Sequence, residues 1–598
     1  MENQDHLHNM RHSGAHLLAA AVQALWPDVK LGVGPVIEHG FYYDFDLDHR
    51  ITEEDFPAIE AKMRELQVEG LGYEREELPI ADAKQRVDEL GQPYKRELIE
   101  TIETTGSTAV MDAEVAESGV GERPTTVSFY TTGAFIDLCR GGHVESTREI
   151  GPFKLLSVAG AYWRGSEQNP MMQRIYAACF ATQEELDAYL KQLEEAKARD
   201  HRKLGRELDL FTFSELVGPG LPLFTPKGTL VRNLLDAFVW SLRNERGYER
   251  VEIPHITKKE LYERSGHWEK FKDDLFKVST RDGHEFAMKP MNCPHHTQIY
   301  ARKQMSYREL PQRYANTTMV YRDEQTGELA GLTRVRAITQ DDAHVFCRYD
   351  QVKDEVASIW DIVETFYKAF DFSLWVRLSF HDPKAPEKYL GGAEVWQKAE
   401  AELRAIAKAR GIETVEAPGE AAFYGPKLDF MAKDSIGREW QVATIQLDMN
   451  MPERFDLTCT NEDGQPERIV MIHAAIMGSI ERFMGVLIEH LAGKFPLWLA
   501  PVQLKVLPIA DRHLEYADAV ARELRQAGYR VEVDVRAESV GKKIRTAQLE
   551  QVPYMLVVGD KEIEAKAVAV RSRDAGNEGV KSLDELTALL RTEANPIS

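Results

Sequence analysis

The sequence predicts a multidomain protein that combines α+β and α/β domains. Three observations support this prediction. The chain has 598 residues, enough for three or four domains of roughly 150 residues each. Between about Phe211 and Phe495, strand-like and helix-like segments mix irregularly, which is typical of an α+β domain. After Pro496, strands and helices alternate, which predicts a small α/β domain.

Composition narrows the class of protein. Hydrophobic residues make up 43% of the chain, and the net charge of −23 argues against diffuse, charge-driven binding of nucleic acid. No apolar run approaches the roughly 20 residues of a membrane span, and the N-terminus lacks a secretory signal. The cysteines are scattered and odd in number, which argues against a disulfide framework: Cys139, Cys179, Cys293, Cys347 and Cys459. We therefore expect a cytoplasmic protein with no membrane partner.

The first predicted domain, residues 1–181, opens with a helix from about His8 to Trp26. His12 and His16 are four residues apart and so share one helical face. Strand-like residues 36–45 and a helix over residues 53–68 follow. Cys139 and His143 are also four residues apart, but the two glycines between them favour a loop over a helix. From the residues alone, this group fits a zinc site, a hydrolytic centre without metal, or coincidence.

Residues 182–210 predict one long charged helix that connects this domain to the next. Its basic residues lie on several faces, which fits a solvated connector, with RNA contact as the alternative. The second domain is then expected over residues 211–495 and the third over residues 496–598.

A predicted hairpin is the most informative stretch of the second domain. Two strand-like runs, Tyr321–Gly327 and Gly331–His344, flank a loop that contains glycine. Arg322 and Arg334 gather there, and guanidinium groups match phosphate oxygens in two-point contacts. The alternative is that these arginines only pair with neighbouring carboxylates, such as that of Glu324.

Other segments of this domain have clear periodicity. Residues 440–448 alternate with period two, which places Thr444 and Gln446 on one face of a strand. The helix after Ser479 has an apolar stripe, and Ser479 is its expected N-cap. Cys293, His344 and His473 supply one thiol and two imidazoles, a donor set that can hold zinc with one open position. Their wide separation in the sequence excludes a zinc finger.

Three segments resemble the conserved motifs of class II aminoacyl-tRNA synthetases. Arg322-x-Glu324 with Arg334 resembles motif 2, Gly478–Phe483 resembles motif 3, and Pro254 after a hydrophobic helix fits motif 1. Met291-Asn-Cys-Pro and Thr339–His344 narrow the resemblance to the threonyl-tRNA synthetase family, bacterial type, over almost the whole chain. The resemblance implies an antiparallel-sheet catalytic core, an N-terminal α+β editing domain and a C-terminal α/β anticodon-binding domain. The ubiquitin-like domain that usually comes first in the family is expected to be missing.

The resemblance assigns roles around ATP and Mg²⁺. It implies that Arg322 and Arg334 steady the α-phosphate and that Arg482 holds the γ-phosphate. The remaining positions that it places near ATP or in catalysis are Glu324, Gln441, Thr444 and Lys427.

For the amino acid, the resemblance implies that Cys293, His344 and His473 bind Zn²⁺ and that Asp342 accepts the hydroxyl hydrogen of threonine. The other implied substrate contacts are Met291, Gln340, Tyr424 and Gln446. A site built around a hydroxyl rejects valine strongly, whereas serine lacks only a methyl group, worth about 1–3 kcal/mol. Serine is therefore expected to pass this site.

The N-terminal domain is expected to correct that error. It resembles the editing domain of bacterial threonyl-tRNA synthetases, which implies metal-independent deacylation of Ser-tRNA(Thr). The residues that match the editing pocket are His12, His16, Tyr43, Lys95, Asp137, Cys139 and His143. In the tail, Glu562 and Arg571 match anticodon-reading positions.

Five positions depart from the family pattern: His295, Gln325, Ala474, Ala537 and Gln551. The last two leave the details of anticodon contact open.

We predict a threonine–tRNA ligase that acts on ATP, L-threonine and tRNA(Thr) and edits Ser-tRNA(Thr). A homodimer is expected, since motif 1 builds the dimer interface in this class. The rivals are a class IIa relative such as a prolyl enzyme, and a non-catalytic tRNA-binding paralogue.

Overall fold

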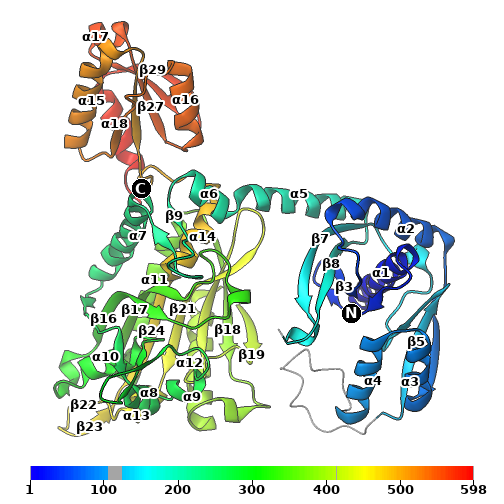
Figure 1. Ribbon diagram of the computed structural model, residues 1–598. Coiled ribbons are helices and arrows are strands. Elements are labelled where there is room, and N and C mark those ends of the chain that lie inside the picture. The colour runs from blue at the N-terminus through cyan, green and yellow to red at the C-terminus, as the bar shows by residue number, and fades with distance from the viewer. Residues whose placement is uncertain (1, 106–123, 167, 413, 597–598) are drawn as a thin grey trace. The chain divides into compact units, whose positions relative to one another are not determined.

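The computed structural model describes residues 2–105, 124–166, 168–412 and 414–596 (Figure 1). The chain divides into two compact units, Met1–Glu194 and Glu195–Ser598.

The first unit is built on an antiparallel sheet against which the long helix α1 packs. Strand order is β1-β3-β8-β7, with β2 paired to β3. Leu18 and Val22 of α1 share one core cluster with Phe41 and Tyr43 of β3, which fixes the helix face that carries the histidines. A smaller sheet, β4-β5-β6, packs with α3 and α4. The elements are α1 (Glu2–Leu25), β1 (Lys30–Leu31), β2 (Val36–Ile37), β3 (Gly40–Asp46), α2 (Phe56–Glu69), β4 (Glu74–Pro79), α3 (Ile80–Glu89), α4 (Pro93–Thr105), β5 (Thr126–Thr132), β6 (Phe135–Leu138), β7 (Phe153–Tyr162) and β8 (Met171–Cys179).

An eight-stranded sheet forms the centre of the second unit. Its order is β11-β16-β17-β24-β21-β20-β18-β19, and the pairs are antiparallel except for the parallel edge pairs β11/β16 and β18/β19. β16 pairs antiparallel with β17, so a hairpin forms here as predicted, but its strand bounds differ from the prediction. The first strand ends at Tyr321, where the first predicted run begins, and the second starts only at Ala337. The strands are β9 (Phe211–Thr212), β10 (Leu223–Phe224), β11 (Glu249–Arg250), β12 (Ile256–Lys258), β13 (Lys277–Ser279), β14 (Glu285–Met288), β15 (Met305–Ser306), β16 (Gln312–Tyr321), β17 (Ala337–Cys347), β18 (Ser373–Phe380), β19 (Thr414–Pro418), β20 (Lys427–Lys433), β21 (Glu439–Asp448), β22 (Thr458–Thr460), β23 (Pro466–Arg468) and β24 (Val470–Ser479).

Helices pack against this sheet and bury its central strands. β17 and β24 are buried along most of their length, and α11 and α14 share their core cluster. Tyr367 of α11 ties the sheet to its helix, because its hydroxyl donates to the carbonyl oxygens of Val442 and Ile476. The helices are α7 (Pro226–Asn244), α8 (Lys259–Ser265), α9 (His267–Lys270), α10 (Cys293–Tyr300), α11 (Val352–Lys368), α12 (Ala393–Arg410), α13 (Asn450–Arg454) and α14 (Ile480–His490). As predicted, Ser479 caps α14, since its hydroxyl accepts the backbone N–H of Arg482.

The tail forms a five-stranded sheet of order β26-β25-β27-β28-β29. The first three strands are parallel, as the alternation of strands and helices predicted, and the last two are antiparallel. The elements are β25 (Leu504–Pro508), α15 (Leu514–Gln526), β26 (Val531–Val533), α16 (Val540–Leu549), β27 (Tyr554–Val558), α17 (Asp560–Ala565), β28 (Val568–Ser572), β29 (Gly576–Lys581) and α18 (Leu583–Glu593).

The connector differs from the prediction. It is two helices, α5 (Gln183–Arg199) and α6 (His201–Glu207), and not one. Asp200 breaks it, because its non-helical backbone (φ −47°, ψ 121°) ends α5 and its side chain accepts the N–H of Arg202 to cap α6. The prediction missed this cap because the charge pattern continues through Asp200. No helix in the described part of the chain is long and apolar enough to cross a membrane. All five cysteines are free thiols.

Candidate active sites

A thiol and two imidazoles meet on the central strands of the second unit. His344 of β17 pairs in register with His473 of β24, and Cys293 is the first residue of α10. His344 Nε2 lies 3.1 Å from His473 Nδ1. The three side chains are buried, and their ligand atoms lie within 4.8 Å of one another. The structure thus brings together the three residues that the sequence suggested as metal ligands.

The protonation of this trio suits a metal ion. His473 Nε2 donates to Asp448 at 2.9 Å, so Nδ1 keeps its lone pair and turns it toward His344. Burial lowers the pKa of His344 well below its ordinary value, which keeps that imidazole neutral. Burial also raises the pKa of the Cys293 thiol well above its usual range, so its thiolate needs a cation beside it. One sulfur and two imidazole nitrogens are a donor set that zinc prefers.

Asp342 lies beside the trio with one carboxylate oxygen held in place. Asn292 donates to Asp342 Oδ2 at 3.0 Å, and Oδ1 lies 3.7 Å from His344 Nε2. Burial raises the pKa of this carboxyl. The ring of Tyr424 lies 5.0 Å from the ring of His473. Of the other predicted substrate contacts, Gln446 donates to the carbonyl of Gly425, Gln340 is half-buried on β17, and Met291 is half-buried just before α10.

The arginines of the hairpin loop and of α14 are in two different states. Arg334 is exposed and pairs with Glu324 at 2.7 Å and Glu328 at 2.9 Å, which is the carboxylate pairing that the sequence left open. Arg322 and Arg482 make no ion pair with any described residue within 4.0 Å. Burial lowers the pKa of the Arg322 guanidinium, whose Nε has no hydrogen-bond partner among the described residues. Arg322 is half-buried and Arg482 is exposed, so both unpaired guanidinium groups are accessible to an incoming anion.

Asp429 organises the polar side chains on β20 and β21. It is fully buried and accepts from Lys427 at 3.1 Å, Gln441 at 2.8 Å and Thr444 at 2.9 Å. Arg377 and Ser379 of β18 also donate to it. The sequence interpretation named Lys427, Gln441 and Thr444 but missed Asp429. Period two along β20, which puts residues 427 and 429 on one face, could have revealed it.

Two buried histidines near the trio were also missed. His267 Nε2 lies 3.6 Å from the sulfur of Cys293, and His296 Nδ1 lies 2.8 Å from His344 Nδ1. His296 lies three residues after Cys293 on α10, so helical spacing gave a signal for it. His267 comes from a separate short helix, and nothing local marks it.

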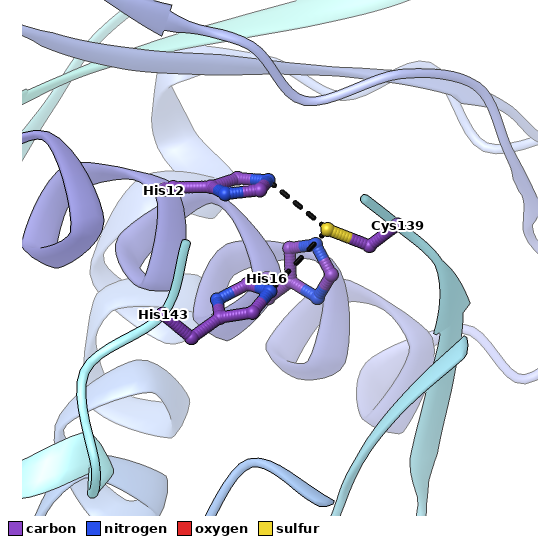
Figure 2. A group of neighbouring side chains, drawn as sticks. All are labelled: His12, His16, Cys139 and His143. Carbon is purple, nitrogen blue, oxygen red and sulfur yellow. Dashed lines mark hydrogen bonds between the residues drawn. The ribbon is translucent and has the colours of Figure 1, made fainter. Parts of the chain in front are cut away.

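A second cluster lies in the first unit, between α1 and the loop after β6 (Figure 2). The sulfur of Cys139 lies 3.4 Å from His12 Nε2 and 3.3 Å from His143 Nε2. His16 packs against the same group, with its ring 4.5 Å from that of His143. Four ligand atoms here lie within 4.8 Å of one another. The predicted helical face and glycine loop therefore meet in one site.

A charged network lies beside these rings. Lys95 and Asp137 form an ion pair of 2.5 Å, and the Tyr43 hydroxyl donates to Asp137 at 2.6 Å. Burial raises the pKa of the Cys139 thiol to about 11. Burial, with His16 and His12 nearby, lowers the pKa of His143 to about 2. At neutral pH the cluster therefore holds a neutral thiol beside a neutral imidazole.

The two predicted anticodon residues lie on neighbouring elements of the tail. Glu562 of α17 accepts the backbone N–H of Gly559, and Arg571 lies on β28 next to β27. Gln551, one of the departures, adopts a left-handed backbone with φ of 55° after α16.

Three family models match this chain. Residues 276–491 match the tRNA synthetase class II core domain (G, H, P, S and T), and residues 503–593 match an anticodon binding domain. Residues 127–176 match the threonyl and alanyl tRNA synthetase second additional domain. The threonine–tRNA ligase of Clostridium tetani is 48% identical over 98% of this chain and 88% of its own length. That of Rubrobacter xylanophilus is 50% identical over 96% of this chain and 87% of its own length. The chain belongs to the threonine–tRNA ligase family.

Solved structures agree with this assignment to the threonine–tRNA ligases. A structure titled as the RNA binding domain of the Cryptosporidium parvum threonyl-tRNA synthetase aligns with a TM-score of 0.63 and 38% identity, covering 66% of this chain and 98% of that one. The family, the class II fold with editing-type and anticodon-binding domains, and the ligase activity predicted from the sequence are thereby confirmed. The reaction of this class uses ATP with Mg²⁺. The prolyl and non-catalytic alternatives have no such support.

Proposed function

We propose that the chain activates threonine on a zinc site, transfers it to tRNA(Thr), and hydrolyses Ser-tRNA(Thr) at a second site without metal. The observation that carries this proposal is the buried trio of Cys293, His344 and His473 beside Asp342. When bound, Zn²⁺ supplies a Lewis-acidic position for an amino group and a hydroxyl group. The arginines of the hairpin and of α14 complete a pocket for amino acid and nucleotide.

In the activation step, guanidinium groups stabilise the charge that builds on the phosphates of ATP. Arg322 and Arg482 have no carboxylate partner among the described residues and need no rearrangement to accept phosphate oxygens. Arg334 has to exchange Glu324 and Glu328 for the α-phosphate. Lys427, Gln441 and Thr444 line the site around Asp429, and Mg²⁺ bound with ATP would supply positive charge to the pyrophosphate.

Selection of threonine depends on the hydroxyl group. Asp342, with one oxygen fixed by Asn292, accepts the hydroxyl hydrogen, and a valine would leave that buried oxygen unpaired. Tyr424, Met291, Gln340 and Gln446 shape the remaining pocket. Serine satisfies Asp342 as well as threonine does, so a second site is required.

The cluster of the first unit is proposed as that second site. Its neutral imidazoles can hold and pass a proton while water attacks the ester of Ser-tRNA(Thr). Cys139 contacts the rings of His12 and His143, and Lys95 pairs with Asp137. That this site works without a metal is proposed from the resemblance to the editing domain.

The domain bounds, the anticodon contacts, the oligomeric state and the location are proposed from the resemblance to the threonyl-tRNA synthetase family. We propose an editing domain over residues 1–181, a linker over 182–210, a catalytic domain over 211–495 and an anticodon-binding domain over 496–598. Glu562 and Arg571 are proposed to contact the anticodon. A homodimer built around the segment of Pro254, working in the cytoplasm, completes the proposal.

Threonine-dependent exchange between ATP and pyrophosphate tests the central claim. Wild-type protein is expected to exchange with threonine and not with proline, and Arg482→Ala is expected to lose exchange by about 10²–10³-fold. Exposed Arg512, which pairs with Asp560 in the tail, provides the matched control, and Arg512→Ala should exchange normally. Absence of threonine-dependent exchange by the wild type would overturn the proposal.

A further inference from the structure

A buried histidine joins the connector helix α6 to the hairpin loop between β16 and β17. His201, the first residue of α6, is 5% exposed. Its Nδ1 lies 2.6 Å from Glu489 Oε1 on α14, and its Nε2 lies 2.9 Å from the backbone N of Leu332 in the hairpin loop. A backbone N–H can only donate, so Nε2 must be the acceptor and Nδ1 must carry the hydrogen. One neutral tautomer of His201 therefore serves both contacts.

The loop approaches His201 closely because it has a glycine there. Gly331 has a φ of 54°, and a Cβ at this position would lie 2.2 Å from His201 Nε2. On the other side, Gly485 of α14 leaves room for Thr333 and Leu332. Leu332 itself is fully buried. The root of the loop that carries Arg334 is thus held between α6 and α14.

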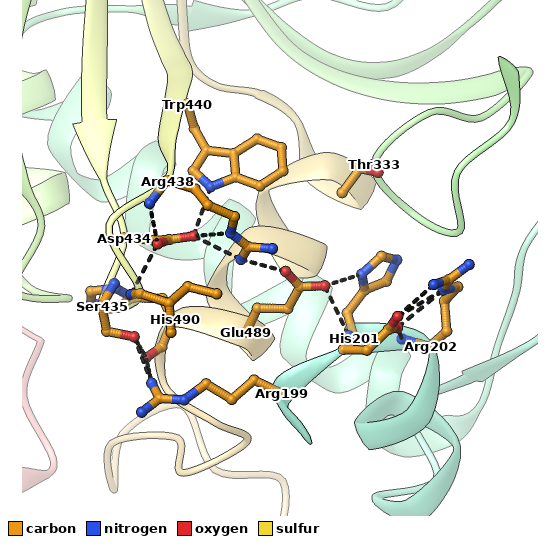
Figure 3. A network of polar contacts seen from close by, with 12 residues as sticks. Arg199, His201, Arg202, Thr333, Asp434, Ser435, Arg438, Trp440, Glu489 and His490 are labelled. Atoms are coloured by element: carbon orange, nitrogen blue, oxygen red, sulfur yellow. Dashed lines mark hydrogen bonds and ion pairs between the residues drawn. The ribbon is translucent and has the colours of Figure 1, made fainter. Parts of the chain in front are cut away.

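The other oxygen of Glu489 accepts from Arg438, which begins a chain of contacts that ends at Arg482. Figure 3 shows His201 and Arg438 on either side of Glu489. Arg438 donates to Glu489 Oε2 at 2.5 Å and to Asp434 at 2.8 Å, and Trp440 donates to Asp434 at 2.9 Å. The ring of Trp440 lies 5.9 Å from the guanidinium of Arg482. Although burial opposes it, the hydrogen bonds from His201 and Arg438 hold the pKa of Glu489 below its ordinary value.

This group is not a metal centre, although Asp200, His201 and Glu489 lie close enough together for one. Both oxygens of Asp200 accept from Arg202. Both oxygens of Glu489 and both ring nitrogens of His201 are occupied as described. The arrangement fits a rigid support, because every polar atom already has a partner.

We propose that His201 of α6 and Glu489 of α14 are positioning residues for ATP. They fix the base of the hairpin loop and, through Arg438 and Asp434, the Trp440 ring that lies next to Arg482. This inference rests on the proposed roles of Arg334 and Arg482. Neither residue touches the amino-acid site, so their loss should affect ATP and leave threonine binding unchanged. The connector thereby takes part in building the nucleotide pocket.

Two substitutions of His201 separate its contacts. The amide of asparagine reaches the place of Nδ1 and keeps Glu489, whereas the amide of glutamine reaches the place of Nε2 and keeps an acceptor for Leu332. In pyrophosphate exchange, His201→Asn should raise the KM for ATP by about tenfold, as expected for one lost buried hydrogen bond. The KM for threonine should stay within about twofold, and His201→Gln should restore most of the ATP KM. Gly331→Ala, which leaves His201 intact but displaces the loop, should also raise the ATP KM.

The chain offers a matched control in the same unit. His381 Nδ1 lies 2.6 Å from Glu400 Oε1, and its backbone N lies 3.1 Å from the same oxygen, as in the His201–Glu489 pair. It makes no described contact with the hairpin loop, so His381→Asn should leave both KM values unchanged. Equal effects of His201→Asn and His381→Asn, or a parallel rise of both KM values, would overturn the inference. If Arg482→Ala leaves ATP use intact, the proposed function fails instead, and the two failures are thereby distinguished.

Discussion

The Asp342 carboxylate shows how one fixed hydrogen bond can determine substrate choice. Asn292 occupies Oδ2, which leaves Oδ1 beside the trio. Asp342→Ala should lower the ratio of kcat/KM for threonine over valine by about tenfold or more, because removing a buried acceptor costs about 1–3 kcal/mol for the hydroxyl substrate. The measurement is pyrophosphate exchange with each amino acid. An unchanged ratio would show that another group reads the hydroxyl.

At the same scale, the trio predicts one tightly bound Zn²⁺ per chain. His344→Ala or His473→Ala should lose the metal and threonine activation together. Asp448→Asn should weaken zinc binding by about 10–100-fold, because Asp448 fixes the tautomer of His473. His295 is as buried as His473, at 7% exposure each, but is not one of the three ligands. His295→Ala should therefore keep its zinc in metal analysis, and metal-free protein that activates threonine normally would contradict the prediction.

At the scale of elements, periodicity predicted which site residues share a face when they lie on the same helix or strand. Helical spacing paired His12 with His16, and strand alternation put Thr444 and Gln446 on one face, because those relations depend only on local geometry. Contacts between distant elements had no such signal. His267 reaches Cys293 from another helix, which nothing local indicates. Strand alternation could have put Asp429 on the face of Lys427, but only the packed sheet shows that it gathers donors from three strands. The break at Asp200 was hidden for a related reason, since a cap is recognised by a hydrogen bond and not by charge pattern.

The pairing of α1 with the glycine loop predicts an unusual pH profile for editing. Burial lowers the pKa of His16 well below its ordinary value and that of His143 to about 2, so neither ring should gain a proton between pH 8 and 6. An ordinary histidine, with a pKa near 6.5, would lose most of its base form over this range. Hydrolysis of preformed Ser-tRNA(Thr) should stay level, within about twofold, from pH 8 to pH 6. A steep fall centred near 6.5 would show that the working base is a solvated group.

At the scale of the whole molecule, the two candidate sites belong to different compact units. The histidine cluster lies wholly within residues 1–194, and the trio, the hairpin and the His201 network lie within residues 195–598. Contacts inside one unit cannot explain activity in the other. The two activities should therefore be separable by substitution.

The last prediction uses this separation. His12→Ala with His16→Ala removes two of the three imidazoles around Cys139 and touches nothing in the second unit. Threonine activation and Thr-tRNA synthesis should stay nearly unchanged, while hydrolysis of Ser-tRNA(Thr) should fall by about 10²–10⁴-fold, the range for a lost general acid or base. Ser-tRNA(Thr) should then accumulate, because one missing methyl cannot exclude serine from the first site. His6→Ala, an exposed residue of the same helix, is the matched control and should edit normally. A chelator added to the wild type should leave hydrolysis intact if no metal takes part. Equal hydrolysis by wild type and double variant would mean that these histidines only fill the interior, because a ring that moves no proton can be removed without slowing the reaction.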